Sequence, residues 1–362
     1  AKPWSLTKAA CCTMATANNG APLSALPDDV LQRILVGVPL DDHRVAAAAC
    51  RAFHDVINGP RFPALRRKYG FAEYGVVVVD DTGDRVHKRV VSIRMAQQSG
   101  AVATISGPGV AHVIERASTT DGGTRLFASI WRRSAAPKIL SVDASSRRWK
   151  HFATLPLNTY NHCIEWHDGR LYFTGGRMYR QFHWNNSLHA FNEAIGLWEE
   201  LPPMPHACAS AASGVIGNEL CIAGGGDEHV ASTQILQIYD ITTRTWRLGA
   251  QLPFPCHDGQ GVVVDGKLFV FGTPGSEVWP PPSRGMLVYD PKCNAWTEET
   301  VPFGSGARVA HACVHKGRIV VFLRNSYAYE RAADGAWSPF SYGVSEEDSR
   351  TARSASGSVL LG

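Results

Sequence analysis

Four pairs of histidine and cysteine recur along the chain, and these residue types could bind a metal. The pairs are His162 with Cys163, His206 with Cys208, Cys256 with His257, and His311 with Cys313. Imidazole and thiolate groups that converge from several units are a plausible ligand set for a transition metal. The offsets of these pairs from the nearest glycine turn differ between units, however. We therefore expect packing and hydrogen bonding, with no metal and no cofactor.

Other motifs of catalysis are absent from the sequence. No G-x-S-x-G, P-loop or H-E-x-x-H pattern occurs. The run Gly224-Gly225-Gly226 could cradle a phosphate, but no strand-to-helix pattern surrounds it. The sequence therefore contains none of these catalytic motifs.

Two residues are candidates for contact with a protein partner. Arg177 begins a basic loop, which is either solvated or complementary to an acidic patch on a client protein. Trp279 lies in a proline-rich loop, where it either binds a partner or packs against its own strands. Both are candidate client-binding residues.

These residues lie among repeats marked by five tryptophans. The intervals between the tryptophans are 49, 48, 50 and 41 residues. An apolar or aromatic residue stands seven or eight positions before each tryptophan, which yields the pairs Val142 and Trp149, Phe191 and Trp198, Tyr239 and Trp246, Tyr289 and Trp296, and Tyr329 and Trp337. A period of 40 to 50 residues indicates a propeller or another solenoid.

Each unit also has a glycine turn before an apolar run, and two units then carry a double glycine, Gly175-Gly176 and Gly224-Gly225. This order of hairpin, double glycine, aromatic residue and tryptophan resembles the kelch repeat over residues 110–339. The resemblance implies an all-β propeller built of four-stranded blades. We expect the aromatic residues to fill the space between blades and the glycines to permit close backbone packing.

The two ends of the repeat region contain strands without a matching unit. We expect repeat units at roughly residues 110–156, 157–205, 206–255, 256–303 and 304–345. Residues 71–106 and 350–362 would share a closing blade, which gives six blades, although five or seven also fit the pattern.

A short helical region precedes the repeats. It contains LPDDVLQRIL at residues 26–35, an alanine-rich second helix and a basic third helix. Pro27 suits the first turn of a helix, and the two aspartates suit its positive end. Three helices in so short a segment bury little core alone, so the region is either a cap on the propeller or a module that a partner covers.

The pattern of LPDDVLQRIL, then Pro-Leu, then Cys-Arg-x-Phe resembles the F-box motif over residues 23–62. The resemblance implies a three-helix domain that binds a Skp-type adaptor. The residues that the motif assigns to this contact are Leu26, Pro27, Val30, Leu31, Ile34, Leu35 and Phe53. The predicted organisation is therefore a disordered leader at residues 1–22, a small all-α F-box at 23–70 and a kelch propeller at 71–362.

Composition agrees with this organisation. The net charge of +4 over 362 residues favours neither nucleic acid nor a membrane surface as partner. Nine cysteines in no CxxC pair, and no secretory or membrane-spanning run, indicate reduced thiols in the cytoplasm or nucleus.

The resemblance as a whole is to the F-box/kelch-repeat family, which is common in plants. It implies a substrate receptor of an SCF-type ubiquitin ligase, joined to a cullin through the adaptor and holding an unknown client on the propeller. The alternatives are a kelch scaffold without a ligase role and an enzyme that uses the central pocket of the propeller.

Overall fold

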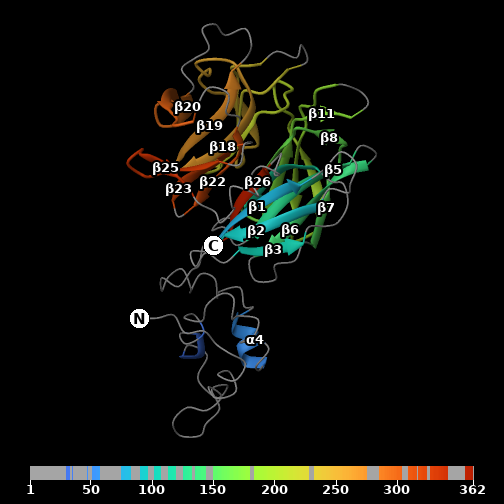
Figure 1. The fold of residues 1–362 in the computed structure, drawn as a ribbon. Helices are drawn as coiled ribbons and strands as arrows, with labels where there is room; N and C mark the ends of the chain where they lie inside the picture. The colour runs from blue at the N-terminus through green and yellow to red at the C-terminus, as the bar shows by residue number, and fades with distance from the viewer. Residues whose placement is uncertain are drawn as a thin grey trace, which may run out of the picture.

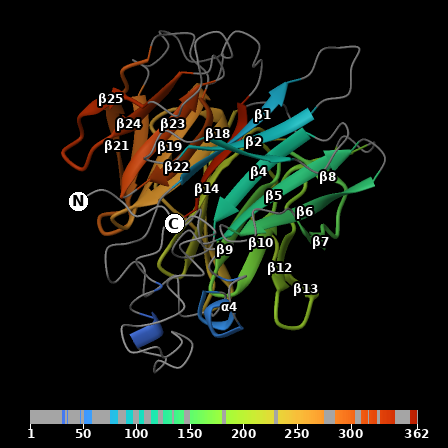
Figure 2. The same ribbon diagram turned by 60° about the horizontal axis from the view of Figure 1, so that its bottom comes forward.

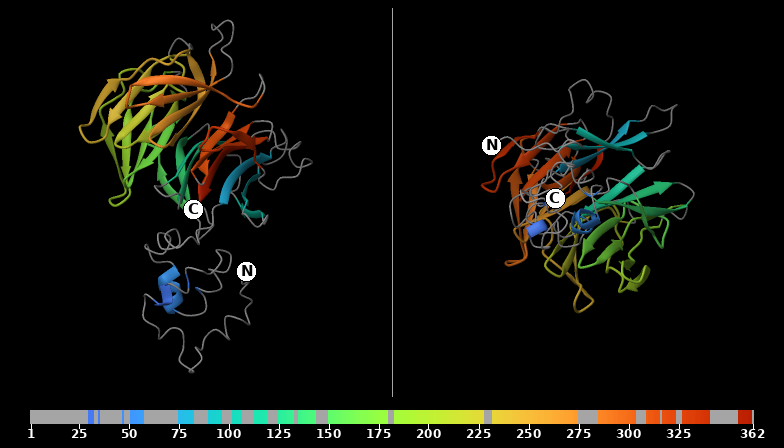
Figure 3. Two further views of the ribbon diagram at one scale, coloured as in Figure 1. Left: turned by 90° about the vertical axis from the view of Figure 1, so that its left-hand side faces the viewer. Right: turned by 90° about the horizontal axis from the view of Figure 1, so that it is seen from below.

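The structure of the chain is a computed structural model, and almost all of its described residues are in strands or the turns that join them. The described residues are 30–32, 35, 47, 51–57, 75–82, 90–96, 102–106, 113–119, 125–132, 135–143, 150–179, 183–227, 232–274, 285–303, 309–315, 317–323, 327–340 and 355–361. Helix α4 (Arg51–Ile57) precedes the first strand, and it stands apart from the sheets in Figures 1 and 3.

Within the described residues, the strands form six four-stranded antiparallel sheets. One sheet joins the first and the last described strands and has the order β26 (Ala355–Leu361), β1 (Gly75–Thr82), β2 (Val90–Ala96) and β3 (Val102–Ser106). The next sheet consists of β4 (Val113–Thr119), β5 (Arg125–Arg132), β6 (Ala135–Asp143) and β7 (Lys150–Thr154).

The central part of the chain contributes two more of these sheets and a two-stranded one. The first has β9 (Cys163–His167), β10 (Arg170–Thr174), β12 (Leu188–Asn192) and β13 (Leu197–Leu201). Beside it, β8 (Thr159–Tyr160) pairs with β11 (Arg177–Met178). The second has β14 (Ala212–Ile216), β15 (Glu219–Ala223), β16 (Leu236–Asp240) and β17 (Thr245–Leu248).

The last two sheets repeat the same order. One contains β18 (Cys256–Val264), β19 (Lys267–Pro274), β20 (Gly285–Asp290) and β21 (Ala295–Thr300). The other contains β22 (Val309–His315), β23 (Arg318–Leu323), β24 (Ala328–Arg331) and β25 (Trp337–Pro339).

The sheets are arranged around a common centre, as Figure 2 shows. In each sheet, the strand at one edge contacts the corresponding edge strand of the next sheet. These edge strands follow one another in the circular order β4, β9, β14, β18, β22 and β26. Sheets that fan out around a central axis define a β-propeller. The prediction of a β-propeller is thereby confirmed.

The repeated tryptophans join neighbouring sheets, as their spacing predicts. The indole Nε1 of Trp246 donates a hydrogen bond to the carbonyl of Pro202 at 2.7 Å, and Trp198 and Trp296 donate in the same way to Thr154 and Ala250. Thr154 is the last residue of β7, Pro202 directly follows β13, and Ala250 lies just after β17. Each acceptor is therefore at the end of the last strand of the preceding sheet. The same contact in three units explains why the tryptophan must recur in phase.

The aromatic residue of each pair lies opposite its tryptophan on the adjacent strand. The ring centroids of Tyr239 and Trp246 are 5.1 Å apart, and those of Tyr289 and Trp296 are 5.2 Å apart. The last unit differs, because Trp337 lies opposite Arg331 rather than Tyr329. This shift agrees with the eight-residue spacing of that unit. Trp149 lies outside the described residues.

The double glycines permit backbone contact between sheets, also as predicted. A Cβ on Gly175 would lie 2.7 Å from the carbonyl oxygen of Cys208, and a Cβ on Gly225 would lie 2.7 Å from that of Ala209. Both glycines have positive φ, at 68° and 93°. A side chain at either position would therefore meet both a steric and a dihedral penalty.

Ion pairs between sheets add a smaller contribution. The Glu199 carboxylate accepts hydrogen bonds from Arg170 in its own sheet and from Arg244 in the next sheet, each at 2.7 Å. These two hydrogen bonds lower the pKa of the Glu199 carboxyl. The side chains are partly exposed, so each pair contributes only about 0–1 kcal/mol to stability.

Candidate adaptor-binding and client-binding surfaces

The helical region before the propeller has a small core of its own. Leu31, Leu35 and Ile57 are 1%, 2% and 6% exposed and form one cluster, against which Phe53 and Val56 pack. Leu31 and Leu35 are one helical turn apart, so they lie on the same face. In this structure that face is covered by α4.

The predicted adaptor contacts therefore divide into two groups. Val30 is 37% exposed, so its side chain is available to a partner. Leu31, Leu35 and Phe53 pack within the cluster and fix the position of the helix that carries Val30. Leu26, Pro27 and Ile34 lie outside the described residues.

The histidine and cysteine residues are used mainly for packing and hydrogen bonding. His162 is fully buried, and its Nε2 lies 2.7 Å from the Ser129 hydroxyl oxygen. Burial raises the pKa of the Cys256 thiol to about 12, so this group is protonated at neutral pH. Within the described part of the chain, no group of three or more His, Cys, Asp or Glu side chains could hold a metal ion.

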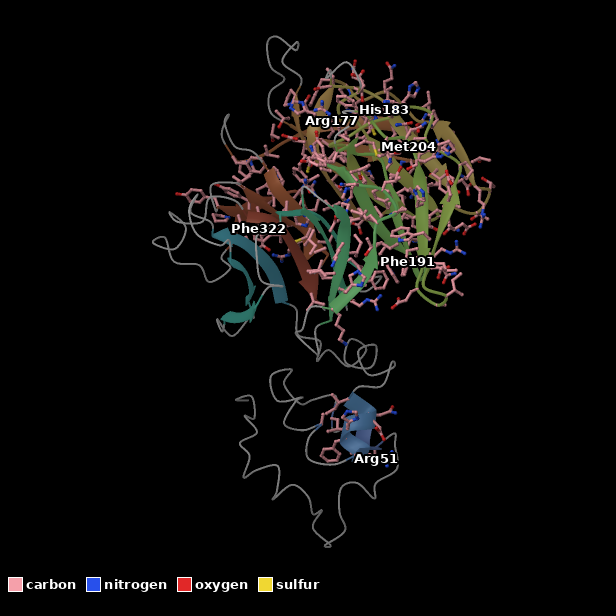
Figure 4. All side chains as sticks on the ribbon, turned by 90° about the vertical axis from the view of Figure 1, so that its right-hand side faces the viewer. Arg51, Arg177, His183, Phe191, Met204 and Phe322 are labelled. Atoms are coloured by element: carbon pink, nitrogen blue, oxygen red, sulfur yellow. The ribbon has the colours of Figure 1, made fainter. Side chains whose placement is uncertain are left out.

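One of the two candidate client-binding residues is described. Arg177 is in β11, and its guanidinium carbon lies 4.5 Å from the ring centroid of Trp184. The two form a cation–π pair. They lie at the end of the propeller where Figure 4 labels Arg177 and His183, which we call the loop end. Trp279 lies outside the described residues.

Next to Arg177 is a pocket that the sequence did not reveal. It has a volume of about 450 Å³ and lies between the sheet of β9–β13 and the sheet of β14–β17. It is lined by His183, Trp184, Asn186, Pro205, His206, Ala207, Cys208, Asp227, Thr233, Ile235 and Gln237. The lining comes from segments far apart in sequence. Only one feature of the local sequence hints at this pocket, namely Gln237, a polar residue inside the otherwise apolar run LQIY.

Two amides hold the walls of this pocket in place. Gln237 is 2% exposed; its Oε1 accepts a hydrogen bond from the His206 backbone N–H at 2.8 Å, and its Nε2 donates to the His206 carbonyl at 3.0 Å. Asn186 donates from Nδ2 to the Met204 carbonyl at 3.1 Å, and the Met204 N–H donates to the Asn186 carbonyl at 2.7 Å. The pocket is therefore formed before any ligand binds.

Parts of this chain are similar to a family model and to a solved structure. The family model of the F-box domain matches residues 23–65. A solved structure, that of YjhT, superposes with a TM-score of 0.55 at 11% identity and covers 73% of this chain and 98% of its own. At that identity, the similarity shows the fold alone.

Curated relatives with kelch names match about half of this chain or less. Kelch repeat and BTB domain-containing protein 12 from Danio rerio is 30% identical over 169 residues, which is 41% of this chain and 27% of the relative. Kelch-like protein 36 from Mus musculus is 25% identical over 171 residues, which is 45% of this chain and 27% of the relative. Kelch-like protein 34 from Homo sapiens is 24% identical over 201 residues, which is 51% and 31% respectively. The matches thus span less than a third of the length of each of these relatives.

The fold and these matches together define the class of protein. The chain has an F-box domain at its N-terminal side and a kelch-type β-propeller after it. These findings support its assignment to the F-box/kelch-repeat family. F-box domains generally bind Skp1-type adaptors. None of the described helices has the length and apolar character needed to cross a membrane.

Proposed function

We propose that the chain is the substrate-recognition subunit of an SCF-type ubiquitin ligase. The F-box binds a Skp-type adaptor, which joins the chain to a cullin, and the propeller loops bind a client protein that is then ubiquitinated and degraded. The observation that carries this proposal is the F-box match at residues 23–65, directly before a propeller. An F-box on a rigid recognition domain is the arrangement that a substrate receptor requires.

In this proposal the chain needs no catalytic residue and no cofactor. Its contribution is to hold the client beside the charged ubiquitin-conjugating enzyme, so that a bimolecular reaction becomes effectively intramolecular. The proposed setting is the cytoplasm or nucleus of a plant cell. A kelch scaffold would share the propeller but would not require adaptor binding.

For the adaptor contact, we propose Val30 together with Leu26, Pro27 and Ile34. Leu31, Leu35 and Phe53 support these residues from the cluster with Ile57. Docking of an amphipathic helical surface into a partner groove stabilises the complex by burying apolar side chains. For the client we propose the loop end of the propeller that carries Arg177, with Trp279 as a second contact.

We also propose that the propeller has six blades. The support is the pairing of β26 with β1, which joins the last described strand to the first in one four-stranded sheet. Strand β26 also contacts both β22 and β4, so this sheet would close the ring. The domains then run from 23–70 for the F-box and from 71–362 for the propeller, with residues 71–106 and 350–362 as the shared blade.

The Leu26→Ala, Ile34→Ala double variant tests the proposed function. Full-length protein expressed in cells is expected to co-purify an endogenous Skp-type adaptor and a cullin, and the double variant is expected to lose both. The thermal unfolding of the propeller should not change, because the two residues belong to the F-box. Co-purification of adaptor and cullin in normal amounts with the double variant would contradict the proposed contact.

A further inference from the structure

The pocket between the sheet of β9–β13 and the sheet of β14–β17 has the size of a small-molecule site. Its volume of about 450 Å³ lies within the range of about 300–1,000 Å³ that is typical of ligand sites. The proposed function assigns no ligand to this cavity. The chemistry of its lining therefore decides what it could hold.

Hydrogen bonds within the chain hold the walls of the pocket. Gln237 uses both ends of its amide on the backbone of His206, and Asn186 and Met204 are joined by two hydrogen bonds. A ligand therefore has little protein to order when it binds, and the entropic cost of binding is reduced.

The charge of the lining favours a cation. Among the described residues that line the pocket, Asp227 is the one with a formal charge, and it is partly buried. A carboxylate that is partly withdrawn from water is stabilised by a positive partner and repels an anion. His183 and His206 are exposed at the rim, and a neutral imidazole accepts a hydrogen bond through one ring nitrogen. These acceptors suit a group with several N–H donors.

The apolar part of the lining favours a ligand with a short apolar body. Trp184 is 7% exposed, and Ile235 is partly buried beside it in the lining. The Arg177 guanidinium stacks on Trp184 with its carbon 4.5 Å from the ring centroid, but Arg177 does not line the pocket. Its charge opposes a second cation only from outside the cavity, which reduces the affinity without filling the site.

We propose that this pocket binds a small organic amine, with a protonated amino group on a short apolar body. The ammonium donates hydrogen bonds to the Asp227 carboxylate, and the body contacts Trp184 and Ile235. This would give the propeller a binding site for a free small molecule, separate from adaptor binding by the F-box.

Three probes of nearly the same shape test the preference for a cation. At neutral pH, phenethylamine is positive, phenethyl alcohol is neutral and hydrocinnamate is negative. Their affinities for the full-length protein are measured by ligand-observed NMR titration. Phenethylamine should bind about tenfold or more tighter than phenethyl alcohol, because a charge-assisted hydrogen bond replaces a neutral one, and hydrocinnamate should bind weakest.

Two results with these probes would overturn the proposal. One is equal affinity for the amine and the alcohol, or a preference for hydrocinnamate, since either would mean that Asp227 does not select the ligand. The other is tighter binding of N-acetyl-lysine methylamide than of phenethylamine. That result would assign the pocket to a lysine side chain of a protein instead of a free amine.

An Asp227→Asn variant gives the second arm. It should weaken phenethylamine about tenfold or more and leave phenethyl alcohol within about twofold of the wild type. Asp265→Asn is the matched control, because Asp265 is exposed in the turn between β18 and β19. Its φ of 51° is a conformation that asparagine adopts readily. Unchanged amine binding by Asp227→Asn, or an equal loss in the control, would also overturn the proposal.

Discussion

Gly225→Ala is expected to destabilise the propeller by about 3 kcal/mol or more. Gly225 has a φ of 93°, and a Cβ there would lie 2.7 Å from the carbonyl oxygen of Ala209 and 3.1 Å from the Cβ of Ala211. Its own N–H donates to the Cys256 carbonyl at 2.8 Å, so the backbone is held on both sides. The Ala209 carbonyl also accepts a hydrogen bond from the Gly226 N–H at 2.8 Å, so Gly225 and the Ala209 segment cannot move apart without breaking one of these two bonds. The measurement is the midpoint of urea unfolding.

Gly217→Ala is the matched control. Gly217 also has positive φ, at 58°, but nothing lies within 4 Å of a Cβ built there. Only the dihedral penalty remains, which costs about 1 kcal/mol. Equal losses of stability in the two variants would show that the double glycine is required for its φ alone, and not for contact between sheets.

Val30→Asp is expected to reduce adaptor binding at least about thirtyfold while the F-box stays folded. Val30 is 37% exposed, and the variant would bury a carboxylate in an apolar interface. The free domain should tolerate the change, because an acidic residue near the start of a helix is favourable. Calorimetric titration with a purified Skp-type adaptor provides the affinity, and circular dichroism checks the helix content.

Leu31→Asp provides the contrast for this prediction. Leu31 is 1% exposed and packs with Leu35 and Ile57, so a charge there should disrupt the cluster itself. Both variants would then fail to bind the adaptor, but only Leu31→Asp would lose helix content. Normal affinity of Val30→Asp would remove Val30 from the proposed contact.

The fold was predictable because its determinants recur in the sequence. The tryptophan of each unit makes a defined contact with the preceding sheet, as Trp198, Trp246 and Trp296 do. A single such residue would be ambiguous, but a repeat in phase indicates a propeller. The F-box was also predictable, because its motif is local and its order of residues is specific.

The sites were less predictable, for two physical reasons. Apolar periodicity identifies the face of a helix that is buried, but it does not say whether the chain or a partner covers it, and α4 covers Leu31 and Leu35. The pocket is assembled from Trp184, His206 and Gln237 on different segments, and only the fold brings these together. The buried amide of Gln237 is the one feature of the sequence that indicates this pocket.

In the proposed function, the F-box binds the adaptor and the propeller binds the client, and a pull-down with the adaptor can separate the two roles. Purified full-length protein, and a version lacking residues 1–71, are each mixed with a purified Skp-type adaptor and pulled down. We predict that the full-length protein binds the adaptor and that the shortened version does not, although its propeller remains folded. Absence of binding by the full-length protein, or equal binding by both versions, would show that the F-box is not the adaptor-binding part of the chain.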